Sequence, residues 1–539
     1  MRYLTLLLCL PAAMLSAAPR MRAPDKSLAG LTIASISIES NNVFQTDAPP
    51  ENKLLYRVAD RIHIKTREAV IRRELLFSIG DRYDPDLIDE TERNLRALPF
   101  IRRAEISAKA NPAGAVDVIV RTYDAWTLEV VANFKRAGGV GSGKAGLADH
   151  NLLGTGKTVS AVYSRDGGSS SKSFAWTDPQ FMGRKHLEYA MLAQSASGSQ
   201  NYSLSLNRPF FASIARSSLG GTMNYAANDV STYSGGAVVG TVKKRVGEAG
   251  INYGIAIGTS TERTRHVRVG LLAHRADFSA IPGQVSGPVP AREQLGFLQL
   301  GADSEELDFI KVRRIQKFTH DEDYNLGFGI FPTLSWAPFI RSLSSSESEI
   351  LPKLIVRKGF AWNDQLLLLN SAVSSTYING GNGNRVASLA AVYFVRGLPI
   401  QTLAFHTAYD HGWRLDPAAP LTLGEANGLR GYGLNQFIGS RRFLFNAEDR
   451  IFVYDQLWRL VDVGAVAFYD TGYVWPTSSS VKFSGLKSSV GLGLRLAPSR
   501  SGNNDPVRID LAYRLNDNQT RSRWSLSILA GQAFGPGFN

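Results

Sequence analysis

The feature that most constrains the fold of this chain is a two-residue period of hydrophobicity that continues from Trp126 to Phe534, over about 400 of its 539 residues. Residues 202–207 (YSLSLN) alternate apolar and polar side chains, and so do residues 507–516 (VRIDLAYRLN). Because successive side chains on a β-strand point to opposite faces, such stretches are typical of strands with one apolar and one polar face. The period predicts an all-β region that occupies most of the chain.

The length of this region favours a barrel. Beyond the N-terminus, no stretch has the roughly 18 consecutive apolar residues of a transmembrane helix. A closed β-barrel spans a membrane with strands of only about ten alternating residues. A soluble β-sandwich would also alternate, but one barrel explains the length. At about 25 residues per strand and loop, residues 126–539 predict an all-β transmembrane barrel of about sixteen antiparallel strands.

The N-terminus has the design of a secretory signal. Arg2 provides the positive start, residues 3–15 form an apolar run, and small residues follow at positions 16–18. We therefore expect a signal peptide over residues 1–18. The only cysteine, Cys9, lies in the apolar run, so the mature chain is expected to have no disulfide and no thiolate metal site. This cysteine usage fits a bacterial outer-membrane protein that crosses an oxidising periplasm.

The region before the barrel mixes two periods. Residues 31–40 (LTIASISIES) alternate like a strand, whereas residues 66–80 and 84–98 place apolar residues at helical spacing. Thr66 and Asp84 are expected N-caps. Two further alternating stretches follow, separated by a turn at residues 111–114. The order predicts a β-α-α-β-β domain of the α+β class over residues 28–125.

One motif suggests a nucleotide site and one property suggests nucleic acid. Residues 151–158 (NLLGTGKT) end like a phosphate-binding P-loop, but Asn151 stands where the first glycine is needed and a strand-like stretch follows instead of a helix. A turn between strands is the better interpretation. The net charge is +13, yet the basic residues are scattered through strand-like segments, so we expect no nucleic-acid partner.

No arrangement of residues predicts catalysis. His406 and His411 are five positions apart, which on a strand places them on opposite faces and argues against a shared metal. No Gly-x-Ser-x-Gly nucleophile elbow occurs in the sequence. We therefore expect no enzyme activity, no metal and no cofactor.

Several stretches together resemble the BamA, TamA and FhaC superfamily of outer-membrane insertases and secretion pores. Residues 80–106 (GDRYDPDLIDETERNLRALPFIRRAEI) resemble a polypeptide-transport-associated (POTRA) domain. Residues 146–159 (GLADHNLLGTGKTV), 176–184 (WTDPQFMGR) and 204–211 (LSLNRPFF) are similar to barrel turns of this group. The resemblance implies one POTRA domain over residues 28–125 and a sixteen-stranded surface-antigen barrel over residues 126–539. One POTRA domain is fewer than most members have.

Two motifs carry the most specific part of the resemblance. Residues 428–433 (GLRGYG) resemble a loop tip that folds back into the barrel, and residues 468–472 (FYDTG) resemble the strand that receives it. Residues 446–450 (NAEDR) resemble the strand between them. An arginine fork in a confined lumen requires a carboxylate. The expected site therefore comprises Arg430, Gly431, Tyr432, Glu448, Asp470 and Gly472. The alternative is a solvated arginine that never meets the acids.

The resemblance also implies a function. We expect a protein of the bacterial outer membrane, with its N-terminal domain in the periplasm, that assists insertion or translocation of proteins or lipids. Expected partners are outer-membrane lipid and unfolded or secreted polypeptides bound by the POTRA domain, with self-association as a further option. A passive porin or a surface receptor barrel remains the alternative. Members of the group end in an aromatic residue on the last strand. Here the expected equivalent is Phe534, displaced inward from the end of the chain, with Phe538 as the alternative.

Overall fold

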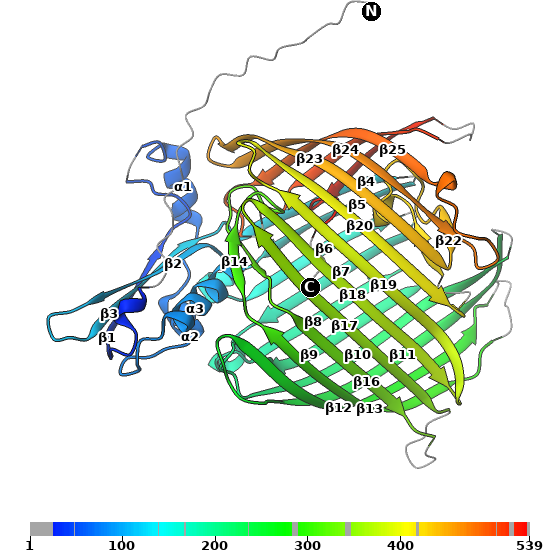
Figure 1. Cartoon of the computed structure of the whole chain (residues 1–539), viewed down its shortest axis with the longest axis horizontal. Coiled ribbons are helices and arrows are strands. Elements are labelled where there is room, and N and C mark those ends of the chain that lie inside the picture. The colour runs from blue at the N-terminus through cyan, green and yellow to red at the C-terminus, as the bar shows by residue number, and fades with distance from the viewer. Residues whose placement is uncertain are drawn as a thin grey trace, which may run out of the picture.

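The computed structural model describes residues 25–535 except for positions 48, 138–139, 167–168, 235–236, 283–288, 340–346, 417–419, 503 and 517–521. The expected signal peptide, residues 1–18 with Cys9, lies outside the described residues. Figure 1 shows two parts, a small α+β domain and a large barrel, with the small domain at one end of the barrel. The change between them falls between Asp124, which ends a strand of the domain, and Leu128, which begins the first barrel strand.

The α+β domain is built on a mixed three-stranded sheet of order β1-β3-β2, in which β1 is parallel to β3 and β2 is antiparallel to it. Its elements are β1 Ile33–Asn41, α1 Leu54–Ile62, α2 Glu68–Glu74, α3 Pro85–Ala97, β2 Ile101–Ala110 and β3 Val116–Asp124, after a short 3-10 turn at Lys26–Leu28. Ile71 of α2, Leu95 of α3 and alternate residues of β3 form one buried core. The predicted strands and both predicted helices are present.

Two details of this domain differ from the sequence prediction. A third helix, α1, lies in the stretch before Thr66, where the sequence predicted no helix. Its apolar residues do not pack as one face on the domain core: Tyr56 is buried toward the barrel, where its hydroxyl donates to the Trp458 carbonyl at 2.9 Å, while Leu54 and Leu55 stay exposed. The pattern of apolar residues therefore did not reveal this helix. Thr66 is not an N-cap, since α2 begins after Arg67. Asp84 does cap α3, because its carboxylate accepts from the backbone N–H of Asp86 at 2.9 Å.

No helix in the described ranges is both long enough and apolar enough to span a membrane.

Within the described ranges, the barrel sheet contains twenty antiparallel strands, with β9 paired to β10 and β27 beside β4. They are β4 Leu128–Ala137, β5 Val140–Asp149, β6 Thr158–Asp166, β7 Ser169–Asp178, β8 Glu188–Ala196, β9 Ser199–Arg208, β10 Ser217–Ser234, β11 Ala237–Ala256, β12 Arg263–Ala280, β13 Glu293–Glu306, β16 Gly329–Ala337, β17 Glu349–Trp362, β18 Gln365–Ile378, β19 Gly381–Val395, β20 Gln401–Trp413, β23 Arg441–Leu457, β24 Val461–Trp475, β25 Lys487–Pro498, β26 Val507–Arg514 and β27 Trp524–Ala530. The expected number of about sixteen is therefore wrong. Many connections are shorter than assumed: only two residues separate β17 from β18, and two separate β18 from β19.

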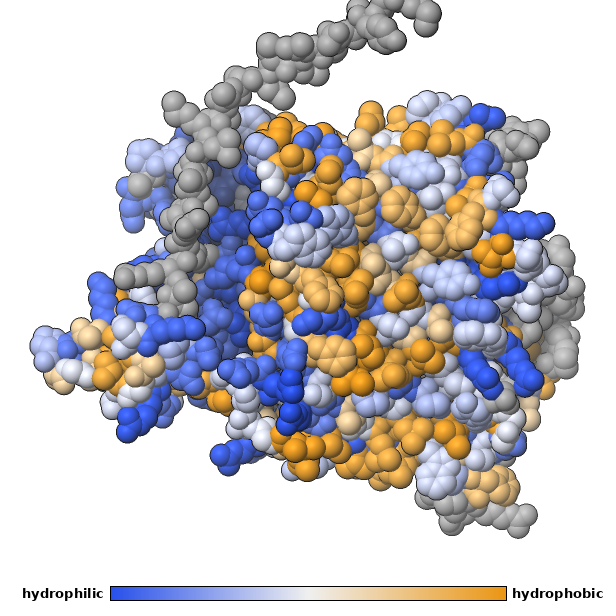
Figure 2. All heavy atoms as spheres, viewed as in Figure 1, coloured by the Kyte–Doolittle hydropathy of each residue, from blue (hydrophilic) through white to orange (hydrophobic). Residues whose placement is uncertain are grey.

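The two faces of the strands differ as the period predicts. On β9, the apolar residues Tyr202, Leu204 and Leu206 are about two-fifths exposed on the outside. On β26, Arg508 and Asp510 are buried on the inside. Figure 2 shows apolar residues gathered over the barrel and more hydrophilic residues over the α+β domain. The barrel thus has an apolar outer surface and a charged interior.

The turn at residues 151–156 attaches the α+β domain to the barrel. Its Asn151 side chain donates to Thr66 Oγ1 at 2.9 Å and accepts from the Gly156 N–H at 2.7 Å. Gly154 has a φ of +71°, and a Cβ there would lie 2.3 Å from the Lys65 carbonyl oxygen, so only glycine fits. The P-loop-like motif is therefore a docking turn. Lys157, its phosphate-ligand position, pairs with Asp178 at 3.0 Å.

Turns further round the same barrel end also contact the domain. Glu90 of α3 accepts from the backbone N–H and the hydroxyl of Ser213, at 2.8 and 2.6 Å. Arg96 of α3 donates to both carboxylate oxygens of Asp323, at 3.1 and 2.8 Å. Ser213 lies in the β9–β10 connection and Asp323 in the β13–β16 connection. The domain therefore lies against the end of the barrel to which these connections belong.

Asp124 is expected to make the stability of the α+β domain depend on pH. Burial raises the pKa of its carboxyl to about 6, while the Thr66 N–H, 2.6 Å away, partly offsets this shift. Between about pH 4 and 6 the folded domain therefore keeps a proton that the unfolded chain has already released. Relative to the unfolded chain, the folded domain is more stable at low pH, and it loses this advantage as pH rises through about 6. Asp124→Asn should then stabilise the domain at pH 7.5 by on the order of 2 kcal/mol and change it little at pH 4.

Pulse proteolysis of the full chain in a urea series, at both pH values, measures this difference. Two basic residues lie near this carboxyl. The positive charge of Lys65 favours the ionised form and opposes the rise in the Asp124 pKa. The His63 ring, whose Nε2 lies 4.0 Å from the Asp124 carboxylate, stays neutral at pH 7.5 because burial lowers its own pKa. An equal loss of stability at both pH values would show that the Asp124 charge is satisfied in the fold.

Candidate functional site

The loop between β20 and β23 folds back into the barrel. It contains two short paired strands, β21 Leu421–Leu423 and β22 Phe437–Gly439, and a 3-10 turn at Glu425–Asn427. Leu423, Leu429 and Tyr432 of the loop are buried against Leu444 and Val474 of the wall. Apolar packing therefore anchors the loop to the wall. The polar contacts at the tip of the loop add to this anchoring.

Two glycines let the tip of the loop approach the wall. Gly431 has a φ of +87°, and a Cβ added there would lie 3.2 Å from Ala512 Cβ on β26. Gly472, on β24, lies where an added Cβ would meet the Phe443 carbonyl at 2.6 Å and Leu423 of the loop at 2.9 Å. Both glycines of the expected site are thus required by close packing between loop and wall.

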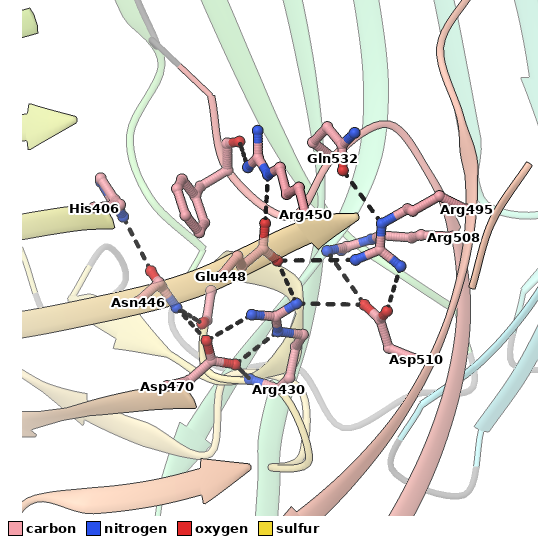
Figure 3. Close-up of polar contacts among 12 residues, drawn as sticks. His406, Arg430, Asn446, Glu448, Arg450, Asp470, Arg495, Arg508, Asp510 and Gln532 are labelled. Atoms are coloured by element: carbon pink, nitrogen blue, oxygen red, sulfur yellow. Dashed lines mark hydrogen bonds and ion pairs between the residues drawn. The ribbon is translucent and has the colours of Figure 1, made fainter. Parts of the chain in front are cut away.

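Arg430, at the tip, forms a two-pronged ion pair with Asp470 of β24. Its Nε lies 2.7 Å from Asp470 Oδ2 and its Nη2 lies 2.7 Å from Oδ1, while its backbone N–H reaches Oδ2 at 3.3 Å. The Arg430 guanidinium carbon also lies 3.6 Å from the centre of the Phe468 ring. Arg430 is 1% exposed and Asp470 is fully buried. The structure thus brings these two predicted residues together (Figure 3).

Glu448 of β23 joins the pair to a second arginine. Its Oε1 accepts from Arg430 Nη1 at 2.6 Å, and its Oε2 accepts from Arg450 Nε at 2.8 Å. Both of its oxygens are therefore used by buried cations. Charge-assisted hydrogen bonds of this length are strong in an interior with little water. Removing one partner is strongly destabilising, because the other charge is then buried without compensation.

Asp510 extends the cluster to β25 and β26. It lies 2.6 Å from Arg495 Nη1, 3.6 Å from Arg430 Nη1 and 3.7 Å from Arg508 Nη1. Four arginines thus surround three carboxylates inside the barrel, all from the loop and from strands β23 to β26 (Figure 3). We call these seven residues the lumen cluster: Arg430, Glu448, Arg450, Asp470, Arg495, Arg508 and Asp510.

Two further polar residues, Asn446 and Ser489, fix the acids and the loop backbone. Asn446 donates to Asp470 Oδ1 at 2.8 Å and to the Gly428 carbonyl at 2.7 Å. Ser489 donates to the Arg430 carbonyl at 2.7 Å. Tyr432, the remaining residue of the expected site, donates its hydroxyl to the Ser488 carbonyl at 3.0 Å. All six expected residues therefore lie in one region, although only three of them form ion pairs.

The sequence prediction missed several residues in and around the lumen cluster. Arg450 and Asn446 could have been found, because positions 446, 448 and 450 share one face of a strand. Arg495 lies on β25, where no motif marks it, and only the register between strands brings it near Asp510. His406, which was considered for a metal, instead contacts Asn446 through Nδ1 at 3.0 Å, and His411 stacks on Trp413.

The C-terminal tail does not have the predicted form. The last strand, β27, ends at Ala530, and Phe534 lies beyond it inside the barrel rather than closing a strand. Gly531, with a φ of +78°, turns the chain inward. The Phe534 carbonyl then accepts from Arg450 Nη2 at 3.0 Å, and its ring stacks on His406 with centroids 5.5 Å apart. The tail as far as Phe534 therefore lies within the barrel, and Figure 1 shows the end of the chain drawn over the barrel.

A second segment enters the barrel beside the tail. The connection from β13 to β16 contains a hairpin, β14 Phe309–Val312 and β15 Glu322–Asn325. Between these strands, Ile315 is buried and its carbonyl accepts from Arg450 Nη1 at 2.6 Å. Gln316 also donates to the Phe534 carbonyl at 3.3 Å. Arg450 thus joins the lumen cluster to two segments that enter from the end covered by the α+β domain.

Comparisons with solved structures find related folds. The chain is similar to BamA from Haemophilus ducreyi lacking POTRA domains 1–3, at 13% identity and a TM-score of 0.38, over 93% of this chain and 84% of that one. It is also similar to CdiB from Acinetobacter baumannii (12% identity, TM-score 0.45, 93% and 73% covered) and to CdiB from Escherichia coli (11%, 0.48, 94% and 76%). No family model and no curated protein matches the chain.

Proposed function

We propose that this protein is an outer-membrane barrel of the BamA, TamA and FhaC type that assists insertion or translocation of polypeptides, without enzyme activity. The observation that carries the proposal is the buried loop arginine, Arg430, held by Asp470 and Glu448. A loop that is anchored inside the lumen by a costly ion cluster is a specific device, which a general diffusion pore does not need.

The filled interior supports this choice over a passive porin. Three segments enter the barrel: the loop with Arg430, the tail with Phe534 and the β14–β15 connection with Ile315. All three meet at or near Glu448 and Arg450. A porin requires a continuous water-filled path, whereas a translocase or insertase is expected to keep its lumen closed at rest.

The α+β domain supports the same function. Its helix order and mixed sheet suit a POTRA domain, with α1 as an addition. In the order β1-β3-β2, strands β1 and β2 are the two edges of the sheet. An exposed edge can accept an extended polypeptide by main-chain hydrogen bonds. We propose that the domain lies in the periplasm and offers the β2 edge to unfolded clients, while outer-membrane lipid surrounds the barrel.

A folding assay in proteoliposomes tests this function. The full chain should accelerate membrane insertion of a urea-unfolded eight-stranded barrel protein at least several-fold over empty liposomes, measured by heat-modifiable mobility. A photo-crosslinker in place of Ser107, an exposed residue of β2, should capture the client. The same crosslinker at Arg72, on the exposed side of α2, is the matched control. Large steady conductance with no acceleration and no adduct would instead identify a porin.

A further inference from the structure

A groove crosses the outer face of the barrel on strands β10 to β13. Cross-strand pairing places Met223, Ala249, Ala273 and Gly296 in one row. In the next row, Gly247 lies between Tyr225 and Arg275. The floor is therefore made of small residues where neighbouring outward positions are large. The groove has a volume of about 1180 Å³, which exceeds the roughly 300–1,000 Å³ of small-molecule sites.

The walls of the groove are apolar, and the space above its floor of small residues is empty. Met223 and Tyr225 form one side, and Leu298 and Trp336 form the other. A Cβ added at Gly247 would meet no atom within 4 Å. The space above Gly247 is thus large enough to accept part of an apolar ligand that lies along the barrel wall.

A cationic rim lies at one end of this groove. Arg275 and Arg292 both contact the single carboxylate of Asp277, at 2.8 and 2.5 Å. Arg245, in the row that pairs with Asp277, donates to the neutral hydroxyl of Ser279 at 3.1 Å. Lys243 pairs with Asp229 at 3.2 Å. Four cations therefore share two carboxylates, and Arg275 and Arg292 are each more than half exposed.

The rim lies at the strand ends remote from the α+β domain. The opposite ends of β11 and β12 lead into the turn where Thr261 contacts Asp86 of that domain, at 3.3 Å. If the domain is periplasmic, as proposed above, the rim lies at the outer leaflet. The combination of an apolar groove below and unbalanced guanidinium groups above matches a lipid with phosphates on its headgroup.

We propose that this groove binds a phosphorylated glycolipid of the outer leaflet, of the lipopolysaccharide type. One acyl chain lies over Gly247 and Ala249, and a headgroup phosphate is held by Arg245 and Arg275. A second copy of the barrel is a poorer occupant. A two-fold contact across the groove would bring the cationic rims of the two copies close together, and their like charges would repel. The inference rests on the proposed orientation and not on insertase activity.

Native mass spectrometry of the purified full chain with bisphosphorylated lipid A tests the proposal. Gly247→Trp should fill the groove and reduce lipid A binding at least tenfold, and Arg245→Glu should do the same through its charge. The matched controls are Val373→Trp on the outward face of β18 and Arg165→Glu on β6, both exposed, which should bind lipid A as wild type does. Heat-modifiable mobility verifies that each variant is folded.

Two further lipids test whether binding requires the phosphates of lipid A or any anionic membrane lipid. Dephosphorylated lipid A and phosphatidylglycerol should each bind at least tenfold more weakly than lipid A. Equal binding of phosphatidylglycerol, or unchanged lipid A binding by folded Gly247→Trp, would overturn the proposal. If Arg245→Glu does not fold, Arg275→Gln provides the charge test, and unchanged binding would likewise contradict it. Because binding is measured without a client, loss of the proposed function would leave this result standing.

Discussion

Replacing Arg430 with alanine is expected to release the loop from the lumen while the barrel remains folded. The change leaves Asp470 and Glu448 buried without their shared cation, and breaking a buried ion pair in this way costs about 3–5 kcal/mol. The strands keep their own hydrogen bonds, so heat-modifiable mobility should be unchanged. Hydrogen exchange and protease cleavage of the loop should rise strongly, and client insertion should be lost.

Asp470→Ala should be similarly damaging, because it removes the two-pronged partner of Arg430. The double variant should be little worse than either single one, since the two residues act as a coupled pair. Arg430→Lys should recover only part of the protection, because an ammonium cannot make the parallel pair of bonds. Arg414→Ala, an exposed arginine in the same loop, is the matched control. Strictly additive losses would show that Arg430 and Asp470 act independently.

Removing the contacts of the C-terminal tail is expected to open the lumen. Phe534→Ala deletes the ring that stacks on His406 and lies 4.9 Å from the Arg450 guanidinium. Because Phe534 is half-buried, the cost should fall below the roughly 3–5 kcal/mol of a fully buried phenylalanine. Truncation after Ala530 removes the whole tail and should have the larger effect, a several-fold rise in conductance across a planar bilayer.

Two comparisons make the tail experiment specific. Arg450→Met removes the cation that joins the Phe534 and Ile315 carbonyls, so it should raise conductance as well. Trp524→Ala, at the exposed start of β27, alters the same C-terminal region without touching the lumen and should leave conductance unchanged. Conductance at the wild-type level in both the truncated chain and Arg450→Met would show that other residues close the pore.

Much of the fold could be predicted from the period of hydrophobicity. Alternation identified outward residues such as Leu511 and inward residues such as Asp510, because side-chain direction on a strand is a local property. The number of strands could not be predicted from local alternation in the same way. It depends on loop length, and connections as short as Asn363–Asp364 raised it from the expected sixteen to twenty.

The site could be predicted only where a motif marked it. Arg430 and Asp470 were found because glycines and a recognisable strand surround them. Arg495 and Ile315 were not, since their contacts depend on register across several strands and on a backbone carbonyl, neither of which leaves a pattern in the sequence. Phe534 was misassigned for a related reason. An aromatic residue near a C-terminus looks the same whether it ends a strand or turns inward.

The most direct test of the account is a disulfide between the loop tip and the wall. In Gly431→Cys/Ala512→Cys, the two Cβ atoms would lie 3.2 Å apart, close to the roughly 3.5–4.5 Å of disulfides, and the left-handed φ of residue 431 costs about 1–2 kcal/mol. The sequence has a single cysteine, Cys9, within the expected signal peptide, so no other thiol competes. The loop position predicts that the pair oxidises in the purified, folded chain, as read from a reduction-sensitive gel shift. In Gly431→Cys/Leu511→Cys the second residue faces outward, so this pair should stay reduced. A Gly431→Cys/Ala512→Cys variant that folds but remains fully reduced would contradict a loop held inside the barrel.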